Sequence, residues 1–393
     1  MTDNTLQPEV PINGIYLHIP YCQQLCYYCD FHFSLSLRDK HQMLAAIGRE
    51  MTLRRQYLHK GNARNTSNQA IDTLYFGGGT PSILTLADIQ TLLQKLHALF
   101  PIQAHAEITL EANPDHLTPQ YLAGLKALGI NRLSIGIQSF HDPELRRMNR
   151  RHTAIDALNS IQNALETGFS NITIDLIYGL PDSTPETFRH SLETALAFPI
   201  PHLSCYHLNI EERTAFAHFR KKGQLIQVSD HNSWAQYRLL CDTLRARGYQ
   251  HYEISNFAQT GSRSRHNLAC WLGAPYLGLG PSAHSFDGQN RQWNLAHNLK
   301  YREGVLRGSG FQETERLSHK DRFHEYLLTR LRIREGIDLH HLQRHFAAFY
   351  PRFRRQLRRY TDTDLVQKRE HTLSLTEKGM FQSDGIIMGL MQD

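Results

Sequence analysis

The chain has 393 residues, of which 40% are hydrophobic and 20% charged, which is typical of a globular protein with room for one barrel-sized domain and a smaller one. Its net charge of +6 is too small to select an anionic partner. No apolar run is long enough to span a membrane and the first residues lack the pattern of a signal peptide, so we expect a cytoplasmic protein.

Short apolar runs alternate with segments of helical periodicity between residues 14 and 210. The expected strands are residues 14–19, 73–76, 107–110, 132–137, 173–177 and 203–208. The expected helices are residues 39–57, 86–99, 119–128, 153–167 and 185–197. This alternation predicts parallel strand–helix units that close into a full or partial barrel, whose strand C-termini carry the functional residues.

The texture of the sequence changes twice beyond residue 210. Residues 248–298 are rich in Gly, Asn, His and aromatic residues, which predicts short strands and ordered loops around a site. Later helices are expected at 322–332, at 339–349 and from 351 onward, with a hairpin formed by 365–367 and 372–375. The predicted organisation is a tail at 1–13, a partial barrel at 14–210, a barrel extension at 211–305 and a winged-helix-like domain at 306–393.

Three of the six cysteines, Cys22, Cys26 and Cys29, lie in one short loop after the first expected strand. Clustered cysteines in a reducing compartment favour metal or redox chemistry over disulfides. Thiolates are the ligands that iron–sulfur clusters prefer, and three of them can hold a [4Fe–4S] cluster whose fourth iron stays open for a cofactor or substrate. A zinc site completed by His18 or His32, or three buried thiols, are the alternatives.

The cysteine triplet, with Tyr28 before its third cysteine, resembles the signature of the radical S-adenosylmethionine (SAM) superfamily. The resemblance implies an α/β fold: a partial (β/α)6 TIM-type barrel with extra C-terminal strands and a small winged-helix-like domain. It also implies that the open iron binds the amino and carboxylate groups of SAM. Reductive cleavage of SAM then gives methionine and a 5′-deoxyadenosyl radical, so the cofactors supply the difficult chemistry.

Polar residues at the ends of the later strands fit the same resemblance. The segment 77–81 (GGGTP) is similar to the superfamily motif that contacts the SAM amino group. Similarity to the coproporphyrinogen-oxidase-like family implies that Glu111 faces the amino group, that Arg150 pairs with the carboxylate, and that Gln138 and Asp175 lie near the ribose. The complete set implied for SAM is Tyr16, Tyr28, Gly78, Gly79, Thr80, Glu111, Gln138, Arg150 and Asp175.

Within that family the chain resembles the HemW-like branch of heme chaperones more than the oxygen-independent coproporphyrinogen III oxidases. Phe31 stands where the oxidases have a further cysteine, and the segment before the first strand is short. The segment 266–271 (HNLACW) is similar to the branch's HNxxYW pattern, with Cys270 in place of tyrosine. The resemblance implies heme as cargo with His266 and Cys270 as candidate ligands, although a structural role for His266 is equally open. His284 is a less specific candidate.

The function that the resemblance implies is heme binding and delivery to heme-accepting respiratory proteins. Two alternatives keep radical chemistry, namely oxidative decarboxylation of coproporphyrinogen III, which Phe31 argues against, and heme degradation by a radical SAM methyltransferase. A fourth is a non-radical protein with a structural iron–sulfur or zinc site. The sequence leaves open whether SAM is cleaved or only bound, and therefore whether the protein is an enzyme.

Arginines gather on one face of the helix expected from residue 351. Such a face is usually solvated, but it can also attract heme propionates, acidic lipid headgroups or an acidic protein. No nucleic-acid partner is expected, because aromatic residues do not interleave with the basic ones. Peripheral membrane association and a homodimer stay open. The arginines are Arg352, Arg354, Arg355, Arg358 and Arg359.

Overall fold

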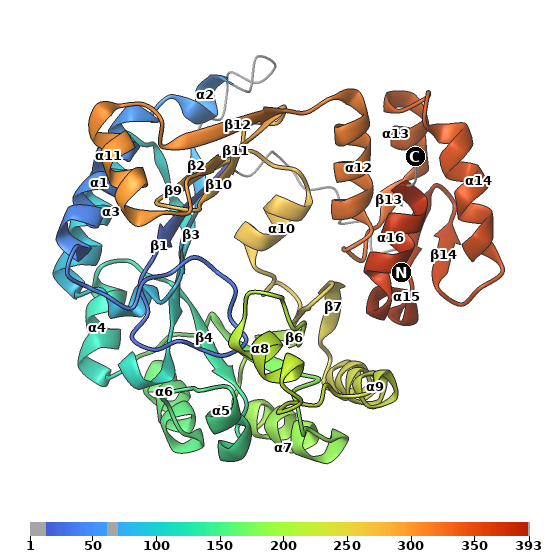
Figure 1. The fold of residues 1–393 in the computed structure, drawn as a ribbon, viewed down its shortest axis with the longest axis horizontal. Coiled ribbons are helices and arrows are strands. Elements are labelled where there is room, and N and C mark those ends of the chain that lie inside the picture. The colour runs from blue at the N-terminus through green and yellow to red at the C-terminus, as the bar shows by residue number, and fades with distance from the viewer. Residues whose placement is uncertain (1–12, 61–69, 392–393) are drawn as a thin grey trace.

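A curved sheet of twelve strands forms the centre of the computed structural model, which describes residues 13–60 and 70–391 (Figure 1). Its parallel middle has the strand order β9-β1-β2-β3-β4-β5-β6. These strands are β1 (Asn13–Ile19), β2 (Ile71–Gly78), β3 (Ile102–Ala112), β4 (Arg132–Gln138), β5 (Ile172–Tyr178), β6 (His202–His207) and β9 (Tyr276–Leu279). The partial barrel is confirmed, and each expected strand overlaps an observed one. Of the expected tail, only Asn13 lies within the described residues, where it begins β1.

Helices follow the parallel strands and surround the sheet on the left and lower sides of Figure 1. Three of them begin at a threonine cap: Thr85, Thr153 and Thr184 each form a capping box with the residue three positions later. The helices are α1 (Lys40–Leu53), α2 (Tyr57–Lys60), α3 (Leu86–Leu99), α4 (Pro119–Ala127), α5 (Asp142–Arg147), α6 (Ala154–Glu166), α7 (Pro185–Leu196), α8 (Ala215–Lys221) and α9 (Asp230–Ala246). No helix in the described ranges is long and apolar enough to cross a bilayer.

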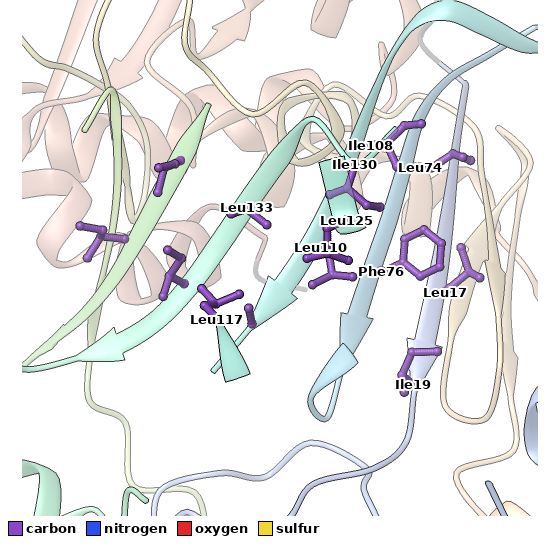
Figure 2. Close-up of a cluster of buried hydrophobic side chains, with 14 of the residues drawn as sticks. Leu17, Ile19, Leu74, Phe76, Ile108, Leu110, Leu117, Leu125, Ile130 and Leu133 are labelled. Carbon is purple, nitrogen blue, oxygen red and sulfur yellow. The ribbon is translucent and has the colours of Figure 1, made fainter. Parts of the chain in front are cut away.

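The two faces of the parallel strands differ in chemistry. Leu17, Phe76, Leu110 and Leu133 are fully buried with their neighbours in one hydrophobic cluster (Figure 2). The alternate positions of the same strands are polar, because successive side chains of a strand point to opposite faces. A parallel strand buried on both faces usually reads as a continuous apolar run. The alternation seen here therefore marks the inner face as the one that builds a site.

The chain extends the sheet at both edges, which confirms the extra strands. Beyond β6 lie the antiparallel strands β8 (Asn256–Ala258) and β7 (Gln250–Glu253). Beyond β9 lie β10 (His284–Phe286), β11 (Asn290–Asn294) and β12 (Gln312–Arg316), also antiparallel. The helix α11 (Asn298–Arg307) connects the last two of these strands.

One sequence expectation in this region is wrong. The HNLACW segment belongs to a helix, α10 (Arg265–Trp271), and not to a strand or loop. The side chain of Ser264 accepts a hydrogen bond from the backbone of Asn267 (3.4 Å) and caps the helix. The buried carboxylate of Glu107 accepts the backbone N–H groups of Arg265 and His266 (3.1 Å each). A side chain remote in sequence thus completes the start of this short helix.

A second hydrophobic cluster forms the core of the C-terminal region, drawn in orange and red at the right of Figure 1. Its sheet has the order β13-β15-β14 and contains the expected hairpin. The elements are α12 (His319–Arg330), β13 (Ile337–Asp338), α13 (Leu339–His345), α14 (Tyr350–Thr361), β14 (Val366–Arg369), β15 (Thr372–Leu375), α15 (Glu377–Phe381) and α16 (Ser383–Met391). This small sheet with its helices is the small C-terminal domain that was expected. The exact domain bounds stay a prediction.

Candidate functional site

The three clustered cysteines lie in the loop that follows β1, and all three thiols are free and half-buried. Backbone hydrogen bonds hold this loop, from Cys22 N to Ser34 O (3.1 Å), from Cys29 N to Cys26 O (3.1 Å) and from Tyr27 N to Met148 O (3.1 Å). The loop is therefore fastened both to its own stem and to the segment after α5. Three thiols on one ordered loop are a set of soft donors suited to iron.

Two side chains from other parts of the barrel donate hydrogen bonds to the sulfur atoms. Thr80 Oγ1 donates to Cys22 Sγ, and Arg150 Nη1 donates to Cys26 Sγ, both at 3.4 Å. Burial raises the pKa of Cys22 to about 12 and that of Cys29 to about 11, so the thiols keep their protons near neutral pH unless a metal displaces them. The donors from Thr80 and Arg150 can then stabilise the thiolates.

The two histidines considered as zinc ligands are engaged elsewhere. His18 Nε2 hydrogen-bonds with the carbonyl oxygen of His32 (2.8 Å), and His32 Nε2 hydrogen-bonds with Asn298 Oδ1 (2.8 Å). In the part of the chain that the structure describes, no three His, Cys, Asp or Glu side chains converge on one metal-ion position. In a [4Fe–4S] cluster each thiolate binds a different iron, so the three-cysteine set fits such a cluster without converging on one point.

The glycine-rich turn at the end of β2 packs directly against the start of the cysteine loop. Gly79 N donates to Ile19 O (2.9 Å), and a Cβ atom on Gly79 would lie 2.6 Å from the carbonyl oxygen of Tyr21. Gly78 has a φ of +112°, a conformation that favours glycine. The close approach of the two segments therefore requires glycine at both positions, and it brings Thr80 to Cys22.

Two carboxylates, Glu111 and Asp175, lie half-buried on the inner face of neighbouring strands. Tyr75 Oη donates to Glu111 Oε1 (2.9 Å), and Ser134 Oγ donates to the carboxylate of Asp175 (3.2 Å). Burial is the main cause that raises the pKa of Glu111 to about 7 and that of Asp175 to about 6, and it outweighs the hydrogen bonds, which lower both values. These carboxylates suit a cationic amino group and hydroxyl donors.

Arg150 links the cysteine loop to the barrel. Its Nη2 donates to Asn113 Oδ1 (2.9 Å) and to Gly136 O (2.7 Å), while Nη1 donates to Tyr28 Oη (3.4 Å) as well as to Cys26. Gln138, at the end of β4, has a φ of +71° beside an irregularity in the β4–β5 register. Strained backbone of this kind is found mainly at functional sites.

The structure thus gathers most of the residues predicted for SAM around the ends of β1 to β5. Tyr16 lies on the same inner face, with its ring centroid 6.0 Å from that of Tyr75. Sequence reasoning missed Tyr75, Asn113 and Ser134 as partners of the predicted residues. The polar alternation along β2 and β4 was the signal for Tyr75 and Ser134, and Asn113 stood inside a motif that was already singled out.

The two residues predicted for heme lie on α10, which packs against β1 and β2. The His266 side chain is only 6% exposed, its Nδ1 hydrogen-bonds with Thr73 Oγ1 (2.8 Å), and its ring stacks on Tyr75 at 5.1 Å. Burial lowers the pKa of His266 to about 4 and raises that of the half-buried Cys270 to about 11, so both are neutral near pH 7. His284 is exposed at the start of β10.

Comparison with known proteins agrees with this geometry. Residues 16–195 match the sequence model of the Radical SAM superfamily and residues 317–381 that of the HemN C-terminal domain. The heme chaperone HemW of Bacillus subtilis (strain 168) is 32% identical over 376 residues, covering 94% of this chain and 96% of that protein. The heme chaperone HemW of Escherichia coli (strain K12) is 31% identical, covering 84% of each chain.

A solved structure extends the likeness to three dimensions. The coproporphyrinogen III oxidase HemN of Escherichia coli, described as a radical SAM enzyme, matches with a TM-score of 0.83 at 26% identity. The match covers 97% of this chain and 90% of HemN. Barrel, extension and C-terminal domain therefore share one architecture with that enzyme.

Proposed function

The chain belongs to the HemW heme chaperone family of radical SAM proteins, and from this premise we propose that it binds heme in the cytoplasm and delivers it to respiratory heme proteins. The observation that carries the proposal is the likeness over nearly the whole chain to proteins named as heme chaperones. Phe31 supports it, because an apolar ring that is 74% exposed follows Cys29 by two residues, at the position where the oxidases have a further cysteine.

The family implies a [4Fe–4S] cluster and SAM. We assign Cys22, Cys26 and Cys29 as the cluster ligands, because their soft donors lie on one ordered loop. The bound cluster supplies the electron for reductive cleavage of SAM. In this assignment Thr80 and Arg150 donate hydrogen bonds to two of the sulfur atoms and offset the negative charge of the thiolates.

We assign the SAM contacts by charge. The ionised carboxylate of Glu111, together with the segment 78–80, receives the amino group, and Arg150 binds the carboxylate. Asp175 and Gln138 lie on adjacent strands and accept hydrogen bonds from the ribose hydroxyl groups. Tyr16 and Tyr28 complete the walls of this site.

One observation favours a second candidate function, the decarboxylation of coproporphyrinogen III. The TM-score of 0.83 against HemN supports this candidate, because the two chains share one architecture. The two functions share the cluster and SAM, so they differ in what is bound and in whether it is changed.

An anaerobic experiment separates the two. The reconstituted, reduced protein is incubated with SAM and coproporphyrinogen III, and separately with hemin, while mass spectrometry follows the products and absorbance follows bound heme. We expect stable heme binding and no decarboxylation. Formation of protoporphyrinogen IX would make the protein an oxidase. The variant Cys26→Ala should lose the cluster absorbance and SAM cleavage but keep hemin binding; parallel loss of hemin in a folded variant would contradict separate sites.

A further inference from the structure

A cavity of about 600 Å³ lies between the barrel extension and the C-terminal domain. The end of α10 and the β10–β11 hairpin form one wall, and α12 and α13 form the other. The two walls are joined by a hydrogen bond from Arg330 Nη2 to Leu272 O (3.0 Å) and by an ion pair between Arg291 and Glu325 (2.7 Å). Binding sites for organic cofactors commonly have volumes of roughly 300–1,000 Å³.

Aromatic rings from both walls line this cavity. Phe286 comes from the hairpin, and Tyr326 and Phe346 come from the C-terminal domain. The ring centroids of Tyr326 and Phe346 are 5.8 Å apart. Such a lining suits a flat, largely apolar ligand, because aromatic rings offer both area and stacking geometry.

Three arginines and three carboxylates line the cavity, and the carboxylates are engaged by other groups. Glu325 is paired with Arg291, Glu335 is paired with Arg263 (2.8 Å), and Asp338 accepts two backbone N–H groups at the start of α13. Arg322 and Arg330 also line the cavity, and neither forms an ion pair with any described residue. The lining carboxylates are therefore engaged, while Arg322 and Arg330 keep guanidinium groups without an ion-pair partner, of which Arg330 also donates to Leu272 O. Both can pair with anionic groups of a ligand.

One imidazole faces the cavity without a hydrogen-bond partner. His341 stacks on Tyr326 at 4.8 Å, and among the described residues no group hydrogen-bonds with its ring nitrogens. Burial, followed by the charge of His345, lowers the pKa of His341, so its ring is neutral near pH 7. A neutral imidazole is a common ligand of heme iron.

We propose that heme binds in this cavity, with His341 as an iron ligand and with Arg322 and Arg330 paired with the propionates. The proposal rests on the function proposed above and adds where the cargo lies. An apolar macrocycle, two carboxylates and a metal match the rings, the two guanidinium groups without ion-pair partners and the imidazole. By contrast, the His266 side chain is only 6% exposed, and its ring is packed against Tyr75 inside the barrel.

The test is a titration of the full, cluster-loaded chain with hemin and with metal-free protoporphyrin IX. His341→Ala should weaken hemin binding by about tenfold or more, which is about 1.4 kcal/mol, and shift the heme absorbance, while protoporphyrin binding stays as in the parent. Arg322→Glu should weaken the binding of both ligands by about tenfold. Each variant must retain SAM binding, which reports that the barrel is folded.

Two matched controls carry the same chemical changes away from the cavity. His340→Ala alters the neighbouring exposed histidine of α13, and Arg354→Glu alters an exposed arginine of α14. Both should bind like the parent, and an equal loss in either would overturn the proposal. If His266→Ala loses hemin while His341→Ala does not, the cavity is the wrong site but the chaperone function stands. If the parent chain binds no hemin, the chaperone function itself fails.

Discussion

At the scale of single residues, Glu111 shows how the barrel interior sets the charge of its own groups. Its carboxyl group lies half-buried on β3, whose other face packs into the hydrophobic cluster. Burial raises the pKa of Glu111 to about 7, and the charge of Asp175 adds to this rise. The hydrogen bond from Tyr75 opposes the rise without cancelling it. Glu111 therefore changes charge close to physiological pH, where a surface glutamate would stay ionised.

This gives a pH dependence of opposite sign for ligand binding and for stability. If ionised Glu111 receives the SAM amino group, SAM affinity should rise by about tenfold between pH 6 and pH 8. The native state holds a proton that the unfolded chain releases, so Glu111 should lower the free energy of unfolding of the SAM-free protein as pH rises from 4.5 to about 7. Calorimetric SAM titrations and urea unfolding measure the two effects.

The variant Glu111→Gln should reduce both slopes, because an amide does not titrate in this range. Burial also raises the pKa of Asp175 to about 6 and that of Glu253 to about 7, so these groups account for the slope that remains. Glu303→Gln, on the exposed face of α11, is the matched control and should leave both slopes unchanged. A SAM affinity that is independent of pH in the parent protein would refute the assignment of Glu111.

At the scale of elements, α10 depends on a single carboxylate from another strand. Seven residues are too few for a helix that is stable by itself. Glu107 on β3 accepts the first two backbone N–H groups of α10, and it lies 4.0 Å from the guanidinium of Arg132, which is 1% exposed. The buried carboxylate of Glu107 thus accepts hydrogen bonds from the first turn of α10 and also balances the buried charge of Arg132.

We expect Glu107→Ala to lower the free energy of unfolding by about 3–5 kcal/mol, because it leaves Arg132 buried without its ion-pair partner. Glu107→Gln keeps an acceptor for the helix and should cost less. Urea unfolding measures both, with the exposed Glu303→Ala expected within about 0.5 kcal/mol of the parent. A loss in Glu107→Ala no larger than in this control would disprove the anchoring role.

At the scale of the whole molecule, the barrel cluster and the C-terminal cluster meet across several polar contacts and a small apolar one. The barrel cluster runs from Ile15 to Phe311, and the C-terminal cluster runs from Phe323 to Leu390. The ion pairs Arg263–Glu335 and Arg291–Glu325 and the backbone bond from Arg334 N to Tyr252 O (3.0 Å) join the two parts. Phe381 of α15 also packs on the Trp234 ring of α9, with ring centroids 5.1 Å apart. A junction with so few apolar contacts lets the parts unfold separately.

Scanning calorimetry should therefore resolve two transitions, and Phe353→Ala should move only one of them. Phe353 is 1% exposed in the C-terminal cluster, so removing its ring should cost that domain about 3–5 kcal/mol while SAM binding by the barrel persists. Phe31→Ala removes an identical ring that is 74% exposed and should leave both transitions in place. One transition that moves as a whole would contradict this independence.

The sequence by itself determined the local features of this protein. The strand–helix alternation predicted the partial barrel, because periodicity along the chain is a local property. The capping boxes of α3, α6 and α7 are local as well, since each is formed by residues within four consecutive positions. The cysteine spacing and the glycine-rich turn likewise predicted the chemistry of the site, since each lies within one short segment.

Only the tertiary structure decided the contacts between distant segments. Arg150 meets Cys26 across 124 positions of sequence, and Glu107 meets His266 across 159. Such pairs leave no periodic signal in the chain, so α10 was expected as loop or strand and the cavity between the two domains was not foreseen. Packing places these groups together because strands far apart in sequence become neighbours in a sheet, and no single segment records that arrangement.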